Sequence, residues 1–225
     1  MKPLTIPRPK GKGVIVLIGG GEFSFGETRQ IDEFCLSRMS RNRTMAFLPT
    51  ASGSAEYGIH LATYFRELAA DVTVVTVPLY RSRDARRVKH CVAIAEAGMV
   101  YLGGGVTNAI ADALRDSPVQ TALMDALSEG SVIVGIGAGA AVLGGVVVDH
   151  FQPGNALVGL NMLHSVAVVT GHNPEDDSRL QRLSSLPDVQ MGIGIPARTA
   201  VVIERDGDAQ ILGEGSIAII RRSGG

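Results

Sequence analysis

Cysteine is scarce in this chain, and neither sign of charge dominates it. The two cysteines, Cys35 and Cys91, lie far apart and form no C-x-x-C pair, so we expect two buried free thiols, which suit a cytoplasmic protein. The formal net charge of −1 gives no global electrostatic reason to expect nucleic acid or an anionic membrane as a partner. The histidines form no H-x-H or H-x-x-x-H pair, so we expect no metal site.

Long apolar runs are absent as well. No segment is long enough and free enough of helix breakers to span a bilayer. Residues 1–12 are basic and contain proline, without the apolar core of a signal peptide, and we expect them to form a flexible N-terminal segment. The triple glycine at residues 19–21 lacks the G-x-G-x-x-G spacing of a dinucleotide site, so we expect no cofactor.

Glycine is abundant, and several of the 28 glycines directly follow an apolar run. Such runs are typical of buried parallel strands, and they alternate here with segments of helical periodicity. The expected strands cover residues 13–18, 44–48, 72–77 and 99–102, and the expected helices cover residues 28–39, 55–70, 88–96, 109–114 and 121–127. We predict one domain over residues 1–225, a three-layer α/β sandwich with a mostly parallel central sheet and antiparallel additions in the C-terminal third.

The stretch at residues 132–143 reads V-I-V-G-I-G-A-G-A-A-V-L. An apolar run, a turn of small residues and a helix-forming pattern follow one another, which is the layout of a nucleophile elbow. Such a turn places one side chain above the carboxyl edge of a sheet and in front of a helix N-terminus. The residue expected at the tip of the turn is Gly137, which has no side chain.

Other short sequence motifs occur in a recognisable order along the chain. They are L-I-G-G-G-E at 17–22, L-P-T-A-S-G at 48–53, Y-L-G-G-G at 101–105, G-I-G-A-G-A-A at 135–141, G-L at 159–160, His172, R-L-Q-R-L at 179–183 and G-I-G-I at 192–195. Together they closely resemble the S51 serine peptidases, the group of dipeptidase E and cyanophycinase, and the cyanophycinase branch matches better. The resemblance implies a fold like that of class I glutamine amidotransferases, and hydrolysis of peptide bonds next to aspartate.

The resemblance also implies a site. In the family a serine at the elbow is the nucleophile, a histidine is the base, an acidic residue orients the histidine, and backbone N–H groups stabilise the oxyanion. Carried onto this chain, it places the base at His172 and the oxyanion donors at Gly104 and Ala138. The pocket around them would include the residues Gly20, Gly21, Thr50, Ser52 and Gly105.

Two of the reactive positions are altered. Gly137 stands at the nucleophile position, and Pro196-Ala197 stand where the family acid would be, so Ala197 marks a lost acid. Asp149 is the alternative acid, as in the dipeptidase branch. Loss of the nucleophile alone costs on the order of a million-fold in rate. Both cysteines lie on expected helices away from strand ends, so the nucleophilic cysteine of an amidotransferase is missing.

These observations predict a pseudo-enzyme: an S51-like protein without peptidase activity. We expect it to keep a pocket for a small acidic or peptide-like ligand or for a partner, and to form a homodimer. Three alternatives stay open. One is an active hydrolase of aspartyl or isoaspartyl peptides that uses an unidentified nucleophile or water, and another is an engineered Ser-to-Gly form of an active enzyme. The third is a purely structural role in a homo-oligomer or in a complex with an active relative. A basic segment is either a solvated surface or a lip that attracts an acidic ligand, and it contains Arg81, Arg83, Arg86, Arg87 and Lys89.

Overall fold

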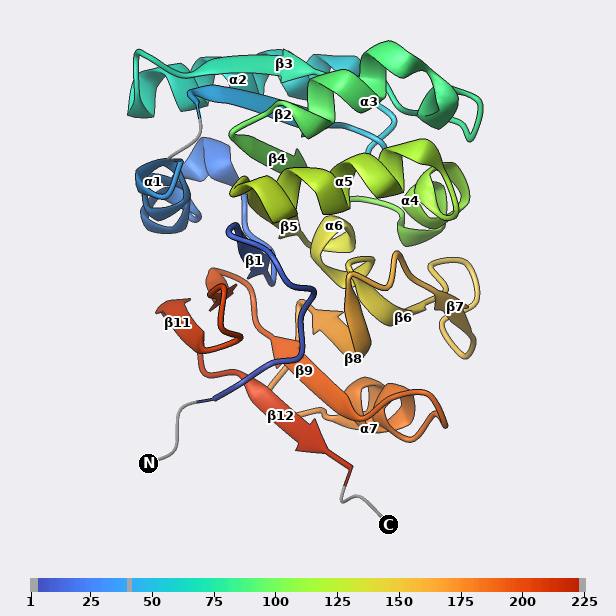
Figure 1. The fold of residues 1–225 in the computed structure, drawn as a ribbon. Helices are drawn as coiled ribbons and strands as arrows, with labels where there is room; N and C mark the ends of the chain where they lie inside the picture. Colours follow the sequence, from blue (N-terminus) through green and yellow to red (C-terminus); the bar gives the residue numbers. More distant parts are fainter. Residues whose placement is uncertain (1–3, 40–41, 223–225) are drawn as a thin grey trace.

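A computed structural model describes residues 4–39 and 42–222. Seven strands form the central sheet in the order β11-β10-β1-β5-β4-β2-β3 (Figure 1). The parallel strands are β1 (Val14–Ile18), β2 (Thr44–Leu48), β3 (Thr73–Thr76), β4 (Met99–Leu102) and β5 (Val132–Ile136). Two antiparallel strands, β10 (Thr199–Ile203) and β11 (Ala209–Gly213), extend the sheet beside β1. The predicted α/β fold with a mostly parallel central sheet is confirmed.

Helices cover both faces of this sheet. One face carries η1 (Phe23–Phe25), α1 (Arg29–Ser37) and α2 (Ala55–Leu68). The other face carries η2 (Asp84–Arg86), α3 (Val88–Ala95), α4 (Thr107–Leu114), α5 (Pro118–Glu129) and α6 (Ala138–Ala141). Side chains alternate along each strand, so Val14 and Val16 pack on the first face and Ile15 and Leu17 on the second. None of the described helices is long and apolar enough to cross a membrane.

A second sheet of five strands follows the elbow, in the order β12-β9-β8-β6-β7. Its strands are β6 (Gly144–Val148), β7 (Ala156–Val158), β8 (Leu163–Thr170), β9 (Met191–Ile195) and β12 (Ala218–Arg221), and α7 (Ser178–Ser184) packs against it. The strands β6, β8 and β9 are parallel. The C-terminal third therefore contributes more than antiparallel additions, and a separate sheet was not expected from the sequence.

Several helix boundaries differ from the expected ones, and three of the differences have a local reason. Helix α4 begins at Thr107, and α5 begins at Pro118, where the Ser117 hydroxyl accepts a hydrogen bond from the Gln120 N–H. Proline fits the first helical position because the N–H it lacks would have no intrahelical acceptor there. The helix expected after the elbow ends at Ala141, because the chain turns directly into β6 at Gly144.

The N-terminal segment is ordered over the part that the structure describes, residues 4–12, which differs from the flexible segment expected over residues 1–12. Ile6 is completely buried in the core. Its N–H donates to the Gly207 carbonyl at 2.9 Å, and the Leu4 carbonyl accepts from the Ala209 N–H at 2.7 Å. One apolar residue among basic residues and prolines has no periodicity, so its burial could not be read from the sequence.

A carboxyl group is buried between α1 and the central sheet. Asp32 is fully buried, and its Oδ2 atom accepts hydrogen bonds from the hydroxyls of Thr28 at 2.7 Å and Tyr64 at 2.8 Å. Its Oδ1 atom has no hydrogen-bond partner among the described residues. Burial disfavours the charged form and raises the pKa of Asp32 to about 6, although the hydroxyl groups around it oppose the shift.

Asp32 makes the stability of the fold depend on pH. Its pKa rises from 3.8 to about 6 on folding, so the folded state holds the proton more tightly than the unfolded state. The contribution of Asp32 to the free energy of unfolding is complete below pH 4. As the pH rises to about 6, this contribution falls by about 3 kcal/mol. We expect Asp32→Asn to remove this loss, so that the difference in unfolding free energy between the two proteins changes across that range. Urea denaturation at several pH values measures it, and a constant difference would contradict the prediction.

Candidate functional site

The elbow lies where β5 meets α6. Gly137 joins them with φ 54° and ψ −117°, a conformation that residues with a side chain rarely adopt. Its N–H donates to the Ile18 carbonyl at 3.0 Å, and its own carbonyl accepts from the N–H groups of Ala140 and Ala141. One residue thus turns the strand into the helix, as the sequence predicts for an elbow.

The glycine loop after β4 lies against the tip of the elbow. A Cβ atom added to Gly137 would be 3.8 Å from the Gly104 Cα atom, which is an ordinary van der Waals contact. Within the described residues, the N–H groups of Gly104 and Ala138 donate to no acceptor. Free N–H groups on two adjoining loops are what the predicted oxyanion donors require. Their role stays a prediction.

A cavity of about 210 Å³ adjoins the elbow. Gly105 and Ala138 line it on the elbow side, Thr170 lines it from the end of β8, and Asp149 lines it from the loop after β6. Arg179 of α7 is also part of the wall, and its guanidinium has no ion pair within the described part of the chain. Together with hydrogen bonds from Ser178, the charge of Arg179 lowers the pKa of the Asp176 carboxyl, and the cavity offers this one guanidinium beside the elbow.

Asp149, the alternative acid, is occupied by its own loop. Its Oδ1 atom accepts hydrogen bonds from Asn108 Nδ2 at 3.1 Å, the Phe151 N–H at 2.8 Å and the Gln152 N–H at 3.0 Å. Partial burial alone would raise the pKa of Asp149, but the hydrogen bonds outweigh it and the pKa is lowered. No hydrogen bond or ion pair joins Asp149 to His172 in residues 4–39 and 42–222. In the structure, Asp149 organises a loop and does not orient the histidine.

His172 is anchored close to the elbow. Its N–H donates to the Ile195 carbonyl at 3.1 Å, and the preceding Gly171 N–H donates to the Gly19 carbonyl at 2.8 Å. Ile18 accepts the hydrogen bond from Gly137, and Gly19 directly follows Ile18. The backbone next to His172 and the elbow are therefore both bonded to the end of β1. The imidazole is buried and packs flat against Gly194, where a Cβ atom would come within 2.7 Å of its Cγ atom.

The imidazole is turned to a carboxylate that the sequence did not single out. Nε2 of His172 lies 3.1 Å from Oδ1 of Asp177, although the angles are not those of a hydrogen bond and Nε2 has no such bond among the described residues. In a serine triad, Nε2 faces the hydroxyl and Nδ1 faces the acid. The nitrogen that would serve a nucleophile at position 137 lies instead beside Asp177. The one available signal was the acidic loop that follows His172.

The other predicted residues lie in two loop regions, one around Ala197 and Gly20 and the other around Thr50 and Ser52. Ala197 lies beside Gly20, whose carbonyl accepts from the Arg198 N–H at 2.9 Å, and it offers only a methyl group where the family acid would be. Thr50 is buried with no hydrogen-bond partner for its hydroxyl among the described residues, and the Ser52 hydroxyl donates to the Pro49 carbonyl. Four predicted pocket residues are not part of the cavity wall at the elbow: Gly20, Gly21, Thr50 and Ser52.

A strand, a one-residue turn and a helix above a mostly parallel sheet, with a glycine loop beside the turn, define an α/β protein with the backbone of a nucleophile elbow. The model of peptidase family S51 matches residues 15–212, and the chain belongs to this family. It is 27% identical to a cyanophycinase from Synechococcus elongatus, an alignment that covers 93% of this chain and 68% of the relative. It is 28% identical to a cyanophycinase from Nostoc, covering 97% and 77% respectively.

A solved structure supports the fold. The crystal structure of a peptidase from an acI-B1 actinobacterium superposes with a TM-score of 0.79 at 23% identity, and the superposition covers 94% of this chain and 93% of that one. The two sheets and the elbow thus belong to a known architecture. The comparisons establish the family and the fold.

We expect a side chain at position 137 to fit sterically but to strain the backbone there. Gly137→Ala should destabilise the protein by about 1–3 kcal/mol, because its Cβ fits while its φ stays positive. The matched control is Gly104→Ala, where φ is not positive and the nearest atom to the new Cβ is 3.5 Å away, so a change below about 1 kcal/mol is expected. Urea denaturation compares the two variants, and equal stabilities would show that the elbow is not strained.

The packing of His172 on Gly194 is testable separately. Gly194→Ala should displace the imidazole and destabilise the protein by about 1–3 kcal/mol, because the added methyl group overlaps the ring. The imidazole resonances of His172 in a nitrogen-15 NMR spectrum report its displacement. Gly154→Ala is the control, since nothing lies within 4 Å of the new Cβ atom. Unchanged resonances in the Gly194 variant would refute the packing argument.

Proposed function

We propose that this chain is an S51 family member that has lost peptidase activity and uses the elbow cavity to bind a small acidic or peptide-like ligand. The observation that carries the proposal is Gly137 at the tip of the elbow: without an oxygen there, no acyl-enzyme can form. Two further observations support it. Nε2 of His172 lies 3.1 Å from Oδ1 of Asp177, and Ala197 has no carboxylate.

The ligand class follows from the cavity. Arg179 is the cation of its wall, and the N–H groups of Gly104 and Ala138 are free donors close by. A carboxylate is the group that a guanidinium and backbone N–H groups bind together, through charge-assisted hydrogen bonds. The volume of about 210 Å³ admits a molecule of the size of an amino acid or a small peptide fragment. The backbone of a former active site would thus be retained as a receptor for an acidic group.

Binding can be measured without any reaction. Calorimetric titration with aspartate and with aspartyl dipeptides should show binding that Arg179→Ala weakens about tenfold, because it removes one charge-assisted contact. Arg182→Ala is the matched control, since Arg182 lies on the same helix outside the cavity and should leave the affinity unchanged. Equal affinities of both variants would exclude Arg179 as the anchor.

Activity separates the pseudo-enzyme from a hydrolase that uses water or another nucleophile. An oxyanion site with water as the attacking group can retain on the order of a thousand-fold acceleration, which is far below a working peptidase. We expect the unmodified chain to hydrolyse α- or β-aspartyl dipeptides no faster than about a thousand times the uncatalysed rate. The Gly137→Ser variant should stay nearly inactive. The double variant Gly137→Ser with Ala197→Glu should turn the dipeptides over faster than the single variant, because a carboxylate then fills the acid position. Efficient turnover by the unmodified chain that His172→Ala abolishes would overturn the proposal.

A further inference from the structure

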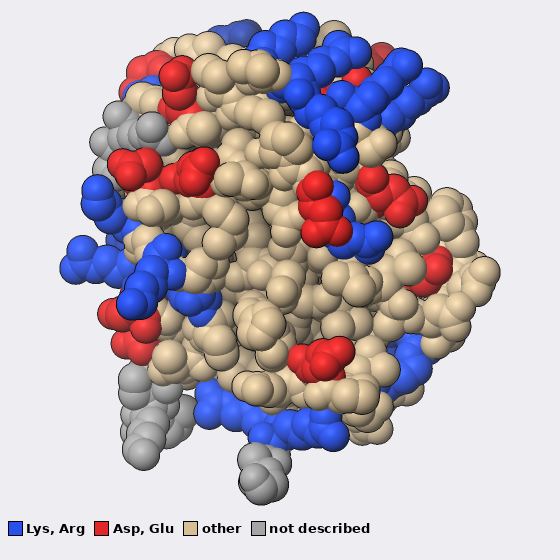
Figure 2. Space-filling view, turned by 45° about the vertical axis from the view of Figure 1, so that its right-hand side comes forward, with Lys and Arg blue, Asp and Glu red and all other residues tan. Residues whose placement is uncertain are grey.

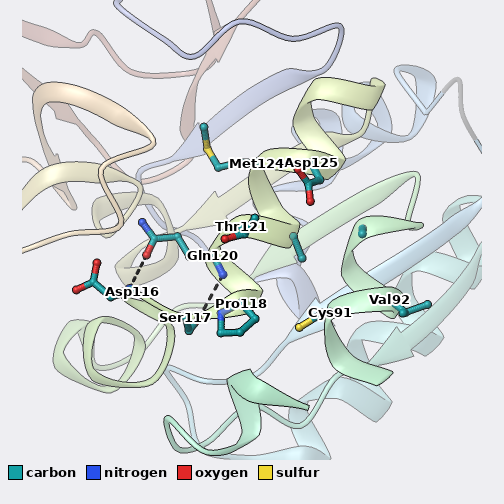
Figure 3. Close-up of a pocket in the computed structure, with 11 residues that line it drawn as sticks. Cys91, Val92, Asp116, Ser117, Pro118, Gln120, Thr121, Met124 and Asp125 are labelled. Carbon is teal, nitrogen blue, oxygen red and sulfur yellow. Dashed lines mark hydrogen bonds between the residues drawn. The ribbon is translucent and has the colours of Figure 1, made fainter. Parts of the chain in front are cut away.

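A cavity of about 550 Å³ lies between η1 and α2, on one face of the central sheet. The elbow cavity is lined by residues of α4 and α6, which cover the opposite face, and the two cavities share no lining residue. The cavity also differs from the groove of about 800 Å³ between α3 and α5, where none of the described wall residues is aromatic (Figure 3). What it binds is therefore independent of the proposed function.

Three aromatic rings line this cavity, which we call the aromatic cavity. Phe23 of η1 packs against two tyrosines of α2: its ring centroid lies 5.3 Å from that of Tyr57 and 5.1 Å from that of Tyr64. The sequence brings both tyrosines to one face of the helix, because about two turns separate them. The faces of aromatic rings carry negative partial charge and attract cations, and the attraction increases where water is excluded.

Two carboxylates without a partner cation belong to the same wall. Glu22 is half-buried and Glu67 is exposed, and neither forms an ion pair with a described residue. One Glu22 oxygen accepts the Ser24 N–H at 3.3 Å, which holds this side chain beside η1. Among the described residues of the wall, His60 is the only one that can carry a positive charge, and Arg66 of the same helix lies outside it. The wall is therefore aromatic and acidic.

A third carboxylate lies behind the rings. The hydroxyl of Tyr64 donates to Asp32 Oδ2 at 2.8 Å, and the Oδ1 atom of this fully buried residue has no hydrogen-bond partner within the described residues. No described cation pairs with it, and the basic residue of α1, Arg29, pairs with Glu33 at 2.9 Å instead. Above its pKa of about 6, Asp32 is a buried negative charge without a counter-ion.

The negative potential of these carboxylates reaches the rings. Burial, and then the charges of Glu22 and Asp32, raise the pKa of Tyr57 to about 12. Burial and the charge of Asp32 raise the pKa of Tyr64 as well. Both shifts mean that the potential at the ring wall disfavours a further negative charge. A cation seated on the rings would be stabilised by the same potential.

The exposed basic residues of the chain gather elsewhere. Arg81, Arg83, Arg86 and Lys89 are exposed around η2 and the start of α3. Figure 2 shows lysine and arginine gathered on one side of a hollow. Elements η2 and α3 cover the face of the sheet opposite to η1 and α2. The part of the chain that the structure describes thus leaves the counter-charge of the aromatic cavity to a ligand.

We propose that the aromatic cavity binds a small organic cation with a quaternary ammonium head group. Such a group has no N–H, and it needs ring surface and nearby negative charge rather than a set of hydrogen-bond acceptors. A guanidinium is held best by a bidentate carboxylate. Here Glu22 has one oxygen engaged by a backbone N–H, and Glu67 is exposed to water. The wall therefore suits the quaternary ion better.

The charge requirement is tested with two ligands of the same shape. Calorimetric titration of the full chain with choline should show binding, and its neutral analogue, in which carbon replaces the nitrogen, should bind about tenfold more weakly. Choline should also shift the ring resonances of Tyr57 and Tyr64 in an NMR spectrum. Equal affinities for the two ligands, no binding of choline, or tighter binding of methylguanidinium than of choline would each overturn the proposal.

Variants locate the binding site. Glu67→Gln should weaken choline binding several-fold, and Tyr57→Leu should weaken it about tenfold. Glu129→Gln is the matched control: it changes the net charge equally but lies on α5, on the other face of the sheet, and should leave the affinity unchanged. Circular dichroism confirms that each variant folds. Equal effects of the two glutamate variants would contradict the assignment.

The elbow cavity provides the last comparison. Arg179→Ala, which should weaken the binding of aspartyl ligands, should leave choline binding unchanged, because Arg179 does not line the aromatic cavity. The two proposals can therefore fail separately. Loss of choline binding in the Arg179 variant would place the cation at the elbow and overturn the assignment to the aromatic cavity.

Discussion

The site depends on one close approach, that of α6 to the carboxyl ends of β4 and β5. A Cβ atom at Gly139 would lie 2.2 Å from the Leu102 carbonyl oxygen, and one at Gly135 would lie 2.5 Å from the Gly139 carbonyl oxygen. No residue larger than glycine fits either position without moving backbone. This contact holds the elbow at the edge of the sheet, and the Gly104 loop, the cavity and His172 are arranged around it. The requirement is independent of whether Gly137 carries a reactive group, so the architecture can persist without the reaction.

The G-I-G-I stretch has a similar physical basis. Gly194 leaves room for the imidazole of His172, and Gly192 leaves room for Ser184, whose hydroxyl oxygen would lie 2.0 Å from an added Cβ atom. The two glycines of β9 therefore allow a histidine loop and α7 to pack closely on the second sheet. The motif that links this chain to its family specifies how the base position is held. The orientation of the ring depends on what else surrounds it, here Asp177.

The altered residues form a consistent set. Gly137 carries no oxygen, Ala197 provides no carboxylate, and Asp149 is engaged by its own loop. The backbone N–H groups of Gly104 and Ala138 and the guanidinium of Arg179 do not depend on those positions. Under the proposed function, the site would lose acyl transfer, which needs three aligned side chains, and would still bind an anion, which needs only backbone donors and one charge.

The sequence by itself determined the strands of the central sheet, the elbow, the missing side chain at Gly137 and the family. These are local features, since apolar periodicity and glycine punctuation are visible along the chain. Only the tertiary structure decided that residues 4–12 pack on the fold, that the last third builds a second sheet, that Asp177 lies beside His172, and that α3 and α5 enclose a groove. Each of these depends on contacts between segments far apart in the chain, and no local pattern specifies which distant segment a side chain will meet.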